Sequence, residues 1–494
     1  MHRRIAVSRS MTFSTQWTTR MTKAGEFFSS KGLLLAIFVL LPLSRLEGQD
    51  TRHVTEPKIP PTCTALTADL VAQGTTLADA DESKPDTGRI QQAMDHCKPG
   101  HAVELKAAGE RNAYLSGPLQ LRQGVTLLVD KGVILFGSRN PRDYDLNPGL
   151  CGTITPRSHS CKPLITGDHV SDAGIMGDGI IDGRGGAKML GQDLTWWQLA
   201  DKAHPWALQN NPRMLVLSAC DDFTLYRIQL RNSPNFHVSY SGGNGFTVWG
   251  VIIGTPGNAH NGDGIDIGQP WPEVPRNTTN ITVTNSYIHA GDDILAFKAP
   301  VGYLTSHGTV THNHFYTGHG MSIGSATTGG VTAIRVSDLT IDGSDDGIRI
   351  KSNVKLGGFV HDVEYSDVCI RNSRDPLIID PFYDSSGHEV DGTDSNHPPL
   401  FADIRLKDVQ IQGGGNLTLK GLDASHRLDI SLQNVFVDHP ESYKIAAGQA
   451  KVQLNGSNIP LTGKDVEVIG KTSAGTANTC DSRFVPFPVP ITVK

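Results

Sequence analysis

The octad FTLYRIQL, residues 223–230, carries apolar side chains at its first, third, sixth and eighth positions. Because neighbouring side chains of a strand point to opposite faces, this order describes two short strands that meet at a polar corner. The same pattern recurs, with few exceptions, in seven later octads: FTVWGVII (246–253), ITVTNSYI (281–288), GTVTHNHF (308–315), IRVSDLTI (334–341), VEYSDVCI (363–370), IRLKDVQI (404–411) and ISLQNVFV (430–437). A pair of short strands is therefore the repeating unit of the chain.

The octads start 23, 35, 27, 26, 29, 41 and 26 residues apart, so some repeats carry inserted loops. A repeat of roughly 25 residues is typical of a solenoid, in which each coil buries its apolar face on the next. Gly 53 and Pro 28 together make about 16% of the 494 residues, against a usual value of about 12%, which suits many tight corners. A β-sandwich also has short strands, but it would not repeat one octad per coil. We therefore expect an all-β fold, a single-stranded parallel β-helix.

A helix is predicted ahead of the coils, at DTGRIQQAMDHC (86–97), where Asp86 or Thr87 can cap its N-terminus. Apolar residues follow at helical spacing within this stretch, and such a helix would cover the open end of the solenoid. The expected organisation is a signal segment over residues 1–48, a lead-in over 49–85, the β-helix domain over 86–470 with this short capping helix at its start, and an irregular tail over 471–494.

The first 48 residues resemble an export signal. Basic residues precede the apolar run GLLLAIFVLLPL (32–43), which is shorter than a membrane span. Cleavage near Gly48 would give a secreted or periplasmic protein, and an uncleaved anchor is the alternative. The net charge of −6 gives no general attraction to nucleic acid or to acidic membranes, so an acidic ligand would need a local basic site.

Seven cysteines suit an oxidising compartment, and their spacing contains no CxxC metal signature. Cys151 and Cys161 are close enough in sequence to form a local bridge. The odd number leaves at least one thiol unpaired. A free, buried cysteine is the simplest interpretation of Cys220 or Cys369.

Four polar clusters follow one another at intervals close to one coil: NGDGID (261–266), GDD (291–293), GHG (318–320) and RIK (349–351). The separations from Asp263 to Asp292, then to His319, then to Arg349 are 29, 27 and 30 residues. Residues one coil apart in a solenoid are stacked neighbours about 4.8 Å apart. The four clusters should therefore form one polar patch.

That patch would contain three carboxylates, an imidazole, a guanidinium and an ammonium group. Glycoside hydrolysis needs two carboxyl groups, one to protonate the leaving oxygen and one to activate water, and crowding of acids raises the pKa of at least one. Asp292 and Asp293 are neighbours in HAGDDILAFK (289–298), where a regular strand would separate them. Gly291 allows a bend or bulge that turns both toward one cleft. The alternative is that these acids only cap turns.

The four clusters, in this order, together with DTGRIQQAMDHC, YLSGPLQL, NPRMLVLSAC and NSPNFHV, resemble the polygalacturonases of glycoside hydrolase family 28. The resemblance covers most of residues 60–440. It implies a right-handed, pectin-lyase-like β-helix and inverting hydrolysis of the α-1,4 bonds between galacturonates in pectin. One departure is the family's Asn-Thr-Asp, which reads Asn261-Gly262-Asp263 here and retains the acid.

The resemblance implies a role for each matching position. Asp292 would be the general acid, and Asp263 with Asp293 would hold and activate the attacking water. His319 would orient the acid through hydrogen bonds. The substrate-binding residues implied in the same way are Arg349 and Lys351, which would pair with the substrate carboxylate, Tyr383 of IDPFYD, and Asn261.

Three other functions are compatible with the same solenoid. A pectate lyase would cleave the same polymer by elimination with calcium, and a non-catalytic carbohydrate-binding protein or adhesin would only bind it. A rhamnogalacturonan or xylogalacturonan hydrolase is the nearest alternative. No metal or cofactor is required, because the acids can pair with Arg349, Lys351 and His319 and lack a calcium loop. We expect a monomer that binds pectic polysaccharide, with no nucleic acid partner and no stable membrane insertion.

Overall fold

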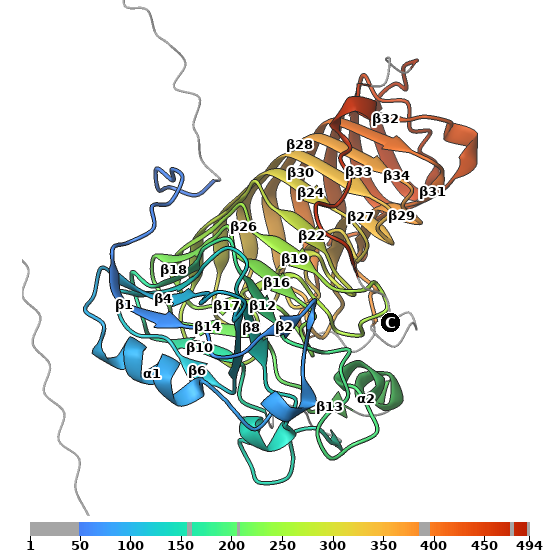
Figure 1. Ribbon diagram of the computed structural model, residues 1–494. Helices are drawn as coiled ribbons and strands as arrows, with labels where there is room; N and C mark the ends of the chain where they lie inside the picture. The colour runs from blue at the N-terminus through green and yellow to red at the C-terminus, as the bar shows by residue number, and fades with distance from the viewer. Residues whose placement is uncertain (1–48, 156–160, 205–207, 385–395, 475–478, 492–494) are drawn as a thin grey trace, which may run out of the picture. The chain divides into compact units, whose positions relative to one another are not determined.

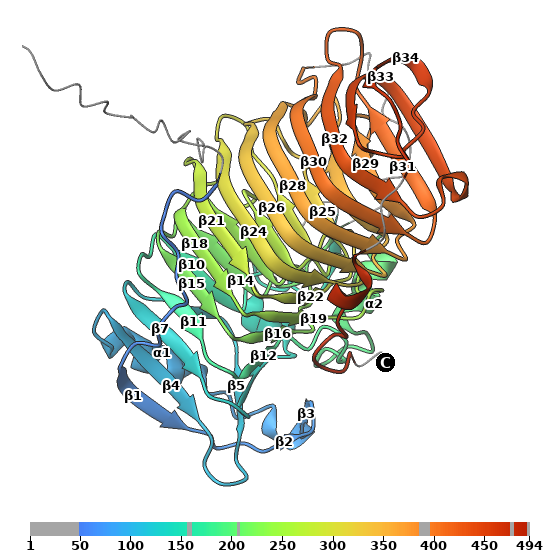
Figure 2. The ribbon, with the colours of Figure 1, turned by 90° about the horizontal axis from the view of Figure 1, so that it is seen from above.

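Parallel strands pair from coil to coil throughout the computed structural model, which describes residues 49–155, 161–204, 208–384, 396–474 and 479–491. Thirty strands belong to one continuous parallel sheet, which winds around a common core. Figures 1 and 2 show these strands as successive rungs, from β1 (Thr62–Thr67) at the blue end to β34 (Gly463–Gly470) at the red end. The predicted parallel β-helix is confirmed. The predicted signal segment lies outside the described residues.

The strands form three columns along the stack, and the pairing within each column is parallel. The first column contains the first half of each octad and the second column the other half. A third column, called here the site column, lies between one octad and the next. The first column is β1, β4 (His101–Lys106), β7 (Val125–Val129), β11 (Gly174–Met176), β15 (Phe223–Tyr226), β18 (Asn244–Trp249), β21 (Thr278–Thr284) and β34. The second column is β5 (Ala113–Ser116), β8 (Ile134–Gly137), β12 (Ile180–Asp182), β16 (Gln229–Arg231), β19 (Ile252–Gly254) and β22 (Tyr287–His289).

Later coils fuse two columns into single long strands. Those that span the first and second columns are β24 (Thr305–Phe315), β26 (Val331–Asp342), β28 (Phe359–Arg371), β30 (Leu400–Gln412) and β32 (Leu428–Val437). The strand β33 (Tyr443–Asn455) joins the site column to the first column. The site column is β6 (Leu119–Gln120), β10 (Ile165–Asp168), β14 (Leu215–Ser218), β17 (Val238–Ser241), β20 (Ile265–Ile267), β23 (Leu295–Phe297), β25 (Met321–Ile323), β27 (Asp346–Lys351), β29 (Asp375–Asp380) and β31 (Gly415–Lys420).

The polar corner of each octad is a single residue with left-handed backbone geometry. The fifth residue of all eight octads has a φ between 47° and 65°. L-residues rarely adopt this region, and Asn and Asp tolerate it best among those with a side chain. Asn or Asp accordingly stands at five of the eight corners: Asn285, Asp338, Asp367, Asp408 and Asn434. One left-handed residue per coil therefore turns the chain from the first column into the second.

Apolar ladders inside the coils hold the stack together. The third residues of the octads, such as Val248, Val283 and Val310, are fully buried and stand in register with one another. Burying one such side chain contributes roughly 1.5–3 kcal/mol. Gly308 breaks the pattern at a first position because a Cβ there would lie 2.8 Å from the Phe297 ring, which occupies that space.

The predicted capping helix is present as α1 (Thr87–His96), with Asp86 at the N-cap position. Ile90 and Met94 enter the core. Gln91 donates to Gln120 O at 3.0 Å and accepts from Gln120 N at 2.8 Å, which satisfies the free edge of β6. The helix therefore covers the N-terminal end of the site column, beside the blue strands in Figure 1.

Three disulfides join Cys63 to Cys97, Cys151 to Cys161, and Cys369 to Cys480. The local bridge is as predicted, and Cys220 is the free, buried cysteine. The interpretation of Cys369 as a free thiol is wrong, because its partner Cys480 comes from the C-terminal tail, 111 residues further along the chain.

The sheet begins before residue 86, since β1 pairs with β4 and lies within the segment assigned to a lead-in. Its residues are half-buried or exposed, so β1 lacks the apolar pattern of the octads and was not predicted from that pattern. The last strand, β34, ends at Gly470, where the predicted tail starts. Among the described residues, no helix has the length and apolar character needed to cross a membrane.

Several short helices and strand pairs lie outside the thirty-stranded sheet. The helix α2 (Trp196–Ala203) is closed at its start by a capping box between Thr195 and Gln198, a Thr-x-x-Gln signal that is readable in the sequence. The remaining elements are the antiparallel pairs β2 (Ala72–Gln73) with β3 (Thr76–Leu77) and β9 (Ile154–Thr155) with β13 (Leu208–Gln209), and the 3-10 turns η1 (Asp79–Asp81), η2 (Pro141–Tyr144), η3 (Pro440–Ser442) and η4 (Asp481–Arg483).

Candidate active site

The four polar clusters lie on neighbouring strands of the site column. Ile265 of β20 pairs with Leu295 of β23, which pairs with Met321 of β25, which pairs with Ile348 of β27. Asp263, Asp293 and His319 each stand two residues before these partners. The predicted single patch is therefore present.

The neighbouring acids Asp292 and Asp293 stand in a bend, because β23 begins only at Leu295. The carbonyl oxygen of Asp292 accepts from His319 N on one side, and that of Asp293 accepts from Gly264 N on the other. A Cβ at Gly291 would lie 2.2 Å from Ala259 O, so only glycine allows this close approach of the two loops. The bend brings both carboxylates into one charged cluster, as expected.

Asp292 is the most accessible of the three predicted acids, with 24% of its side chain exposed against 4% for Asp293. Its Oδ1 lies 3.0 Å from His319 Nδ1 and also accepts from Asp293 N at 2.9 Å. Burial opposes ionisation of Asp292, but the hydrogen bond and charge of His319 together with the charge of Lys351 outweigh it and lower the pKa of this carboxyl. The pKa of His319 is raised, because Asp292 outweighs the effect of burial. The two side chains therefore form an ion pair that holds one proton at His319.

Asp293 is buried among cations. Its Oδ1 lies 2.9 Å from Lys351 Nζ and 3.2 Å from Arg349 Nη1, and it accepts from Ser322 Oγ at 2.9 Å. Burial alone would raise the pKa of Asp293, but Lys351, Arg349 and Lys298 lower it well below the usual range. Asp293 is therefore a permanent carboxylate in this site.

Asp263 is as buried as Asp293, with only 3% of its surface exposed, but it forms no ion pair with a cation among the described residues. Burial first, and then the charges of Asp292 and Asp266, raise its pKa well above the usual value. Its Oδ1 has no hydrogen-bond partner among the described residues, and the same holds for Asp266 Oδ2. One oxygen each of Asp263, Asp266 and Asp293 lies within 4.8 Å of the others. A proton on Asp263 would relieve this repulsion, in agreement with its raised pKa.

Asp266, which is fully buried, and Lys298, which is largely buried, form an ion pair that the sequence alone did not assign to the site. Lys298 Nζ lies 2.7 Å from Asp266 Oδ1 and 3.9 Å from an oxygen of Asp293. Burial lowers the pKa of Lys298, but Asp266 and Asp293 outweigh it and raise that pKa. The second acid of NGDGID and the lysine that ends ILAFK are the sequence signals for this pair.

His237, in the NSPNFHV stretch, contacts the backbone of Asp263. The side chain is fully buried, and burial lowers its pKa to about 4, so the ring is neutral. Its Nε2 accepts from Ser233 N at 3.3 Å, which leaves Nδ1 to donate to Asp263 O at 2.8 Å. His237 therefore fixes the backbone that carries Asp263.

The predicted substrate-binding residues divide into two groups. Arg349 and Lys351 contact Asp293, and Arg349 also pairs with Asp346 at 3.0 Å. The Tyr383 ring centroid lies 5.2 Å from the guanidinium carbon of Arg349 and 4.9 Å from Lys351 Nζ, so this tyrosine joins the two cations. Asn261 lies apart from them, where its Oδ1 accepts from Gln209 Nε2 at 2.7 Å.

Acids and cations form ion pairs throughout this cluster. Lys298 pairs with Asp266, and His319 pairs with Asp292 and Asp345. Arg349 pairs with Asp293 and Asp346, and Lys351 pairs with Asp293. Two groups of side chains could offer ligand atoms to a metal ion: Asp292, Asp293 and His319, or Asp263, Asp266 and Asp293. A metal in either place would compete with the cations for the same oxygens. An anionic group of a ligand, by contrast, could pair with Arg349 and Lys351.

Comparisons with known proteins show the family of this chain. The family model of glycosyl hydrolases family 28 matches residues 89–456. A curated endo-polygalacturonase from Pectobacterium carotovorum is 39% identical, covering 85% of this chain and 98% of its own length. A polygalacturonase from Ralstonia nicotianae is 36% identical, covering 88% and 92% respectively.

The solved structure of a polygalacturonase from Erwinia carotovora superposes with a TM-score of 0.67 at 35% identity, covering 86% of this chain and 97% of that one. Its parallel coils extend the agreement from sequence to fold. The chain therefore belongs to glycosyl hydrolase family 28 and is a glycoside hydrolase built on a parallel β-helix.

Proposed function

We propose that this protein is a polygalacturonase that hydrolyses α-1,4-galacturonosidic bonds of pectin with inversion. The observation that carries the proposal is the 36–39% identity, over 85–88% of the chain, to proteins named polygalacturonase or endo-polygalacturonase. The cations of the site support it, because a galacturonate adds one carboxylate and needs cations to bind it. Arg349 and Lys351 supply them, beside the Tyr383 ring.

Asp292 is the proposed general acid, since it is the most exposed of the three acids and has His319 as a proton partner 3.0 Å away. Burial opposes ionisation of Asp292, but its cationic neighbours lower its pKa and favour the ionised form. A substrate carboxylate bound at Arg349 and Lys351 would add a negative charge to the cluster and raise that pKa. Binding of substrate therefore favours the protonated form that the acid role needs.

Asp263 and Asp293 are the proposed partners of the attacking water. The cations around Asp293 favour its carboxylate form, whereas the raised pKa of Asp263 favours a protonated form, which would have to lose its proton before it could accept one from water. The raised pKa of Asp263 favours the reverse assignment, in which Asp263 is the acid and Asp292 the base. We favour the first assignment on the exposure of Asp292, because the leaving oxygen must reach the acid from the cleft.

A substrate whose leaving group needs no proton separates the two assignments. Loss of the general acid spares such a substrate, while loss of the base does not. We expect Asp292→Asn to lose turnover of polygalacturonate by several orders of magnitude and to keep fluoride release from galacturonosyl fluoride. Asp263→Asn should lose both activities, and the opposite outcome would assign the acid role to Asp263. Asp178→Asn, which removes half of an exposed ion pair with Arg227 outside the site, is the matched control.

The reaction itself is tested with purified protein on polygalacturonate. Reducing ends should appear, and proton spectra taken early should show the β-anomer, because inversion of an α-linkage gives that product first. An absorbing unsaturated product that disappears with chelator would indicate a lyase instead. Binding without new reducing ends would indicate a carbohydrate-binding protein, and faster cleavage of rhamnogalacturonan or xylogalacturonan would change the substrate.

Export is part of the proposal. Three disulfides, Cys63–Cys97, Cys151–Cys161 and Cys369–Cys480, favour an oxidising compartment, which agrees with the export signal read from residues 1–48. N-terminal sequencing of protein recovered from the medium or the periplasm should begin near residue 49. An intact Met1 on membrane-bound material would favour the uncleaved anchor.

A further inference from the structure

The C-terminal segment, residues 485–491, lies against the second column and is not a strand of the sheet. Figure 2 shows this red segment beside β19 and β22, although the red coils that precede it in sequence lie at the far end of the stack. A disulfide from Cys480 to Cys369 and ion pairs of Arg483 with Asp338 and Asp367 attach the chain just before it. The segment therefore runs back along the coils from a fixed anchor.

Proline and apolar residues alternate in this segment, which reads VPFPVPI. Its three prolines are exposed, whereas Val485, Phe487, Val489 and Ile491 are half-buried. Proline fixes φ and has no N–H, so it favours an extended chain that cannot join the sheet as another strand. Side chains therefore hold the segment in place, together with the hydrogen bond that Tyr316 Oη donates to Val485 O at 2.9 Å.

Phe487 packs on the ends of the second-column strands in three successive coils. Its ring centroid lies 5.7 Å from that of His289, which ends β22, and 5.1 Å from that of Tyr316, which follows β24. Both contacts are edge-on, with interplanar angles of 62° and 77°, a geometry that aromatic pairs prefer. At the end of β19, Gly254 leaves room for the ring, because a Cβ there would lie 3.4 Å from Phe487 Cζ.

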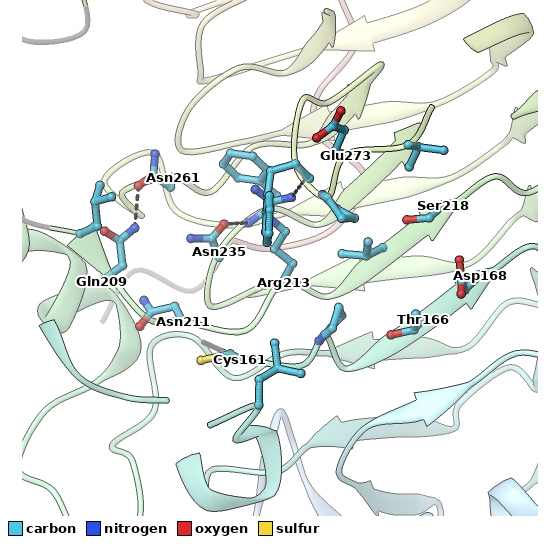
Figure 3. Close-up of a pocket in the computed structure, with 18 of the residues that line it drawn as sticks. Cys161, Thr166, Asp168, Gln209, Asn211, Arg213, Ser218, Asn235, Asn261 and Glu273 are labelled. Atoms are coloured by element: carbon cyan, nitrogen blue, oxygen red, sulfur yellow. Dashed lines mark hydrogen bonds between the residues drawn. The ribbon is translucent and has the colours of Figure 1, made fainter. Parts of the chain in front are cut away.

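The strand ends under this ring are the points where the loops of the candidate active site begin. The loop after β19 leads to Asp263, the loop after β22 to Asp292, and the residues after β24 to His319. Figure 3 shows Asn261 of the first loop beside a cavity of about 500 Å³. The C-terminal segment therefore lies against the bases of three loops whose far ends carry the site.

Backbone hydrogen bonds join these loops to one another. Directly beyond the strand ends, Ala290 N donates to Thr317 O at 2.9 Å. Nearer the acids, Gly291 N donates to Gly262 O at 3.1 Å. Because the loops are bonded in this way, a shift at one base is passed to the neighbouring loops.

We propose that Phe487 is a positioning residue for the hydrolytic reaction, which holds the bases of the three loops so that Asp263, Asp292 and His319 keep their relative places. The proposal rests on the proposed function. The contact of 3.0 Å between Asp292 Oδ1 and His319 Nδ1 joins two of these loops, so its length depends on how their bases are held. A misplacement of about 1 Å can cost a factor of about 10² in rate, so Phe487 can act on turnover without touching substrate.

Phe487→Ala tests this role in the full chain on polygalacturonate. We expect kcat to fall roughly 10- to 100-fold while KM stays within about threefold, because the lost contact misplaces the acid and not the substrate-binding cations. Phe487→Tyr keeps the ring and should restore kcat to within about twofold of wild type. Phe484→Ala is the matched control, since this phenylalanine of the same tail lies over Arg371 at 4.1 Å, and its kcat should stay within about twofold of wild type.

Hydrogen exchange of the loops gives a readout that needs no turnover. Amides in peptides that cover residues 255–264, 290–294 and 317–320 should exchange faster in Phe487→Ala than in wild type or Phe484→Ala. Faster exchange would support the positioning role even if wild type released no reducing ends, a result that would count against the proposed function alone. Unchanged kcat or unchanged exchange in Phe487→Ala, an equal fall of kcat in Phe484→Ala, or no recovery by Phe487→Tyr would each overturn the proposal.

Discussion

The buried ion pair between Asp266 and Lys298 makes a quantitative prediction about stability. Both side chains are deeply buried, with 0% and 12% of their surfaces exposed, and their charged atoms lie 2.7 Å apart. Lys298→Met keeps the length of the side chain and removes its charge. Asp266 Oδ1 would then lose its hydrogen bond from Lys298 Nζ, and Asp266 Oδ2 already lacks a partner among the described residues.

Removing one member of a buried pair costs about 3–5 kcal/mol, because the remaining charge is left uncompensated. The compact unit from residue 46 to residue 494 has an unfolding entropy of about 0.9 kcal/mol per kelvin, at roughly 2.1 cal/mol/K for each residue. The penalty therefore corresponds to a fall in Tm of about 3–5 °C. Lys188→Met, which removes an exposed lysine 3.5 Å from Asp193, should change Tm by no more than about 1 °C.

The fall should depend on pH. Burial raises the pKa of Asp266 in the folded state even with Lys298 present, and the variant loses the cation that opposes this shift. A carboxyl whose folded pKa exceeds its unfolded pKa destabilises the fold when it is ionised, and this penalty shrinks as pH falls through the folded pKa. The difference in Tm between wild type and Lys298→Met should therefore be larger at pH 8 than at pH 5.

Thermal unfolding followed by circular dichroism at both pH values, at one scan rate, measures these differences. Adding Asp266→Asn to Lys298→Met removes the uncompensated charge and should recover a large part of the loss at pH 8. A Tm within 1 °C of wild type, an equal fall at both pH values, or no recovery in the double variant would each refute the reasoning.

Three further predictions concern other parts of the fold. Burial raises the pKa of Cys220 to about 11, so a thiol reagent at pH 8 should label the native protein far more slowly than the unfolded protein. Gly262→Thr, which restores the usual Asn-Thr-Asp, should lower Tm by about 1–3 °C and not raise activity, because its Cβ would lie 2.7 Å from Ala259 O. Cys480→Ala opens a bridge that spans 111 residues and should lower Tm by about 5 °C, whereas an unchanged Tm would show that the tail contributes nothing to stability.

The fold could be predicted from the octads because each coil repeats the same sequence pattern of two strands and a corner. Apolar residues at two positions on each side of a corner define the strands, and a corner residue such as Asn285 or Asp338 marks the turn. The strand β1 was not predicted, because its residues are half exposed at the edge of the stack. The pairing of Cys369 with Cys480 was not predicted either, because it depends on where the tail returns along the coils, and no local sequence pattern contains that information.

The site was predictable as a group and less so in its contacts. Spacing by one coil brought Asp263, the GDD acids, His319 and the RIK cations together. Spacing does not say which anion each cation meets, and in the structure both Arg349 and Lys351 meet Asp293. Their predicted role toward a substrate carboxylate stays a prediction.

Stacking is the physical reason why these residues must be read together. A parallel column places like positions of successive coils about 4.8 Å apart, so a run of acids repeated from coil to coil would repel itself. This column avoids the repulsion by placing Lys298 against Asp266, and Lys351 with Arg349 against Asp293. Asp263 forms no ion pair among the described residues, and burial with the charges of Asp292 and Asp266 raises its pKa well above the usual value. The same alternation that makes the column stable therefore separates the proton affinities of its carboxyl groups, which is the property that acid–base hydrolysis requires.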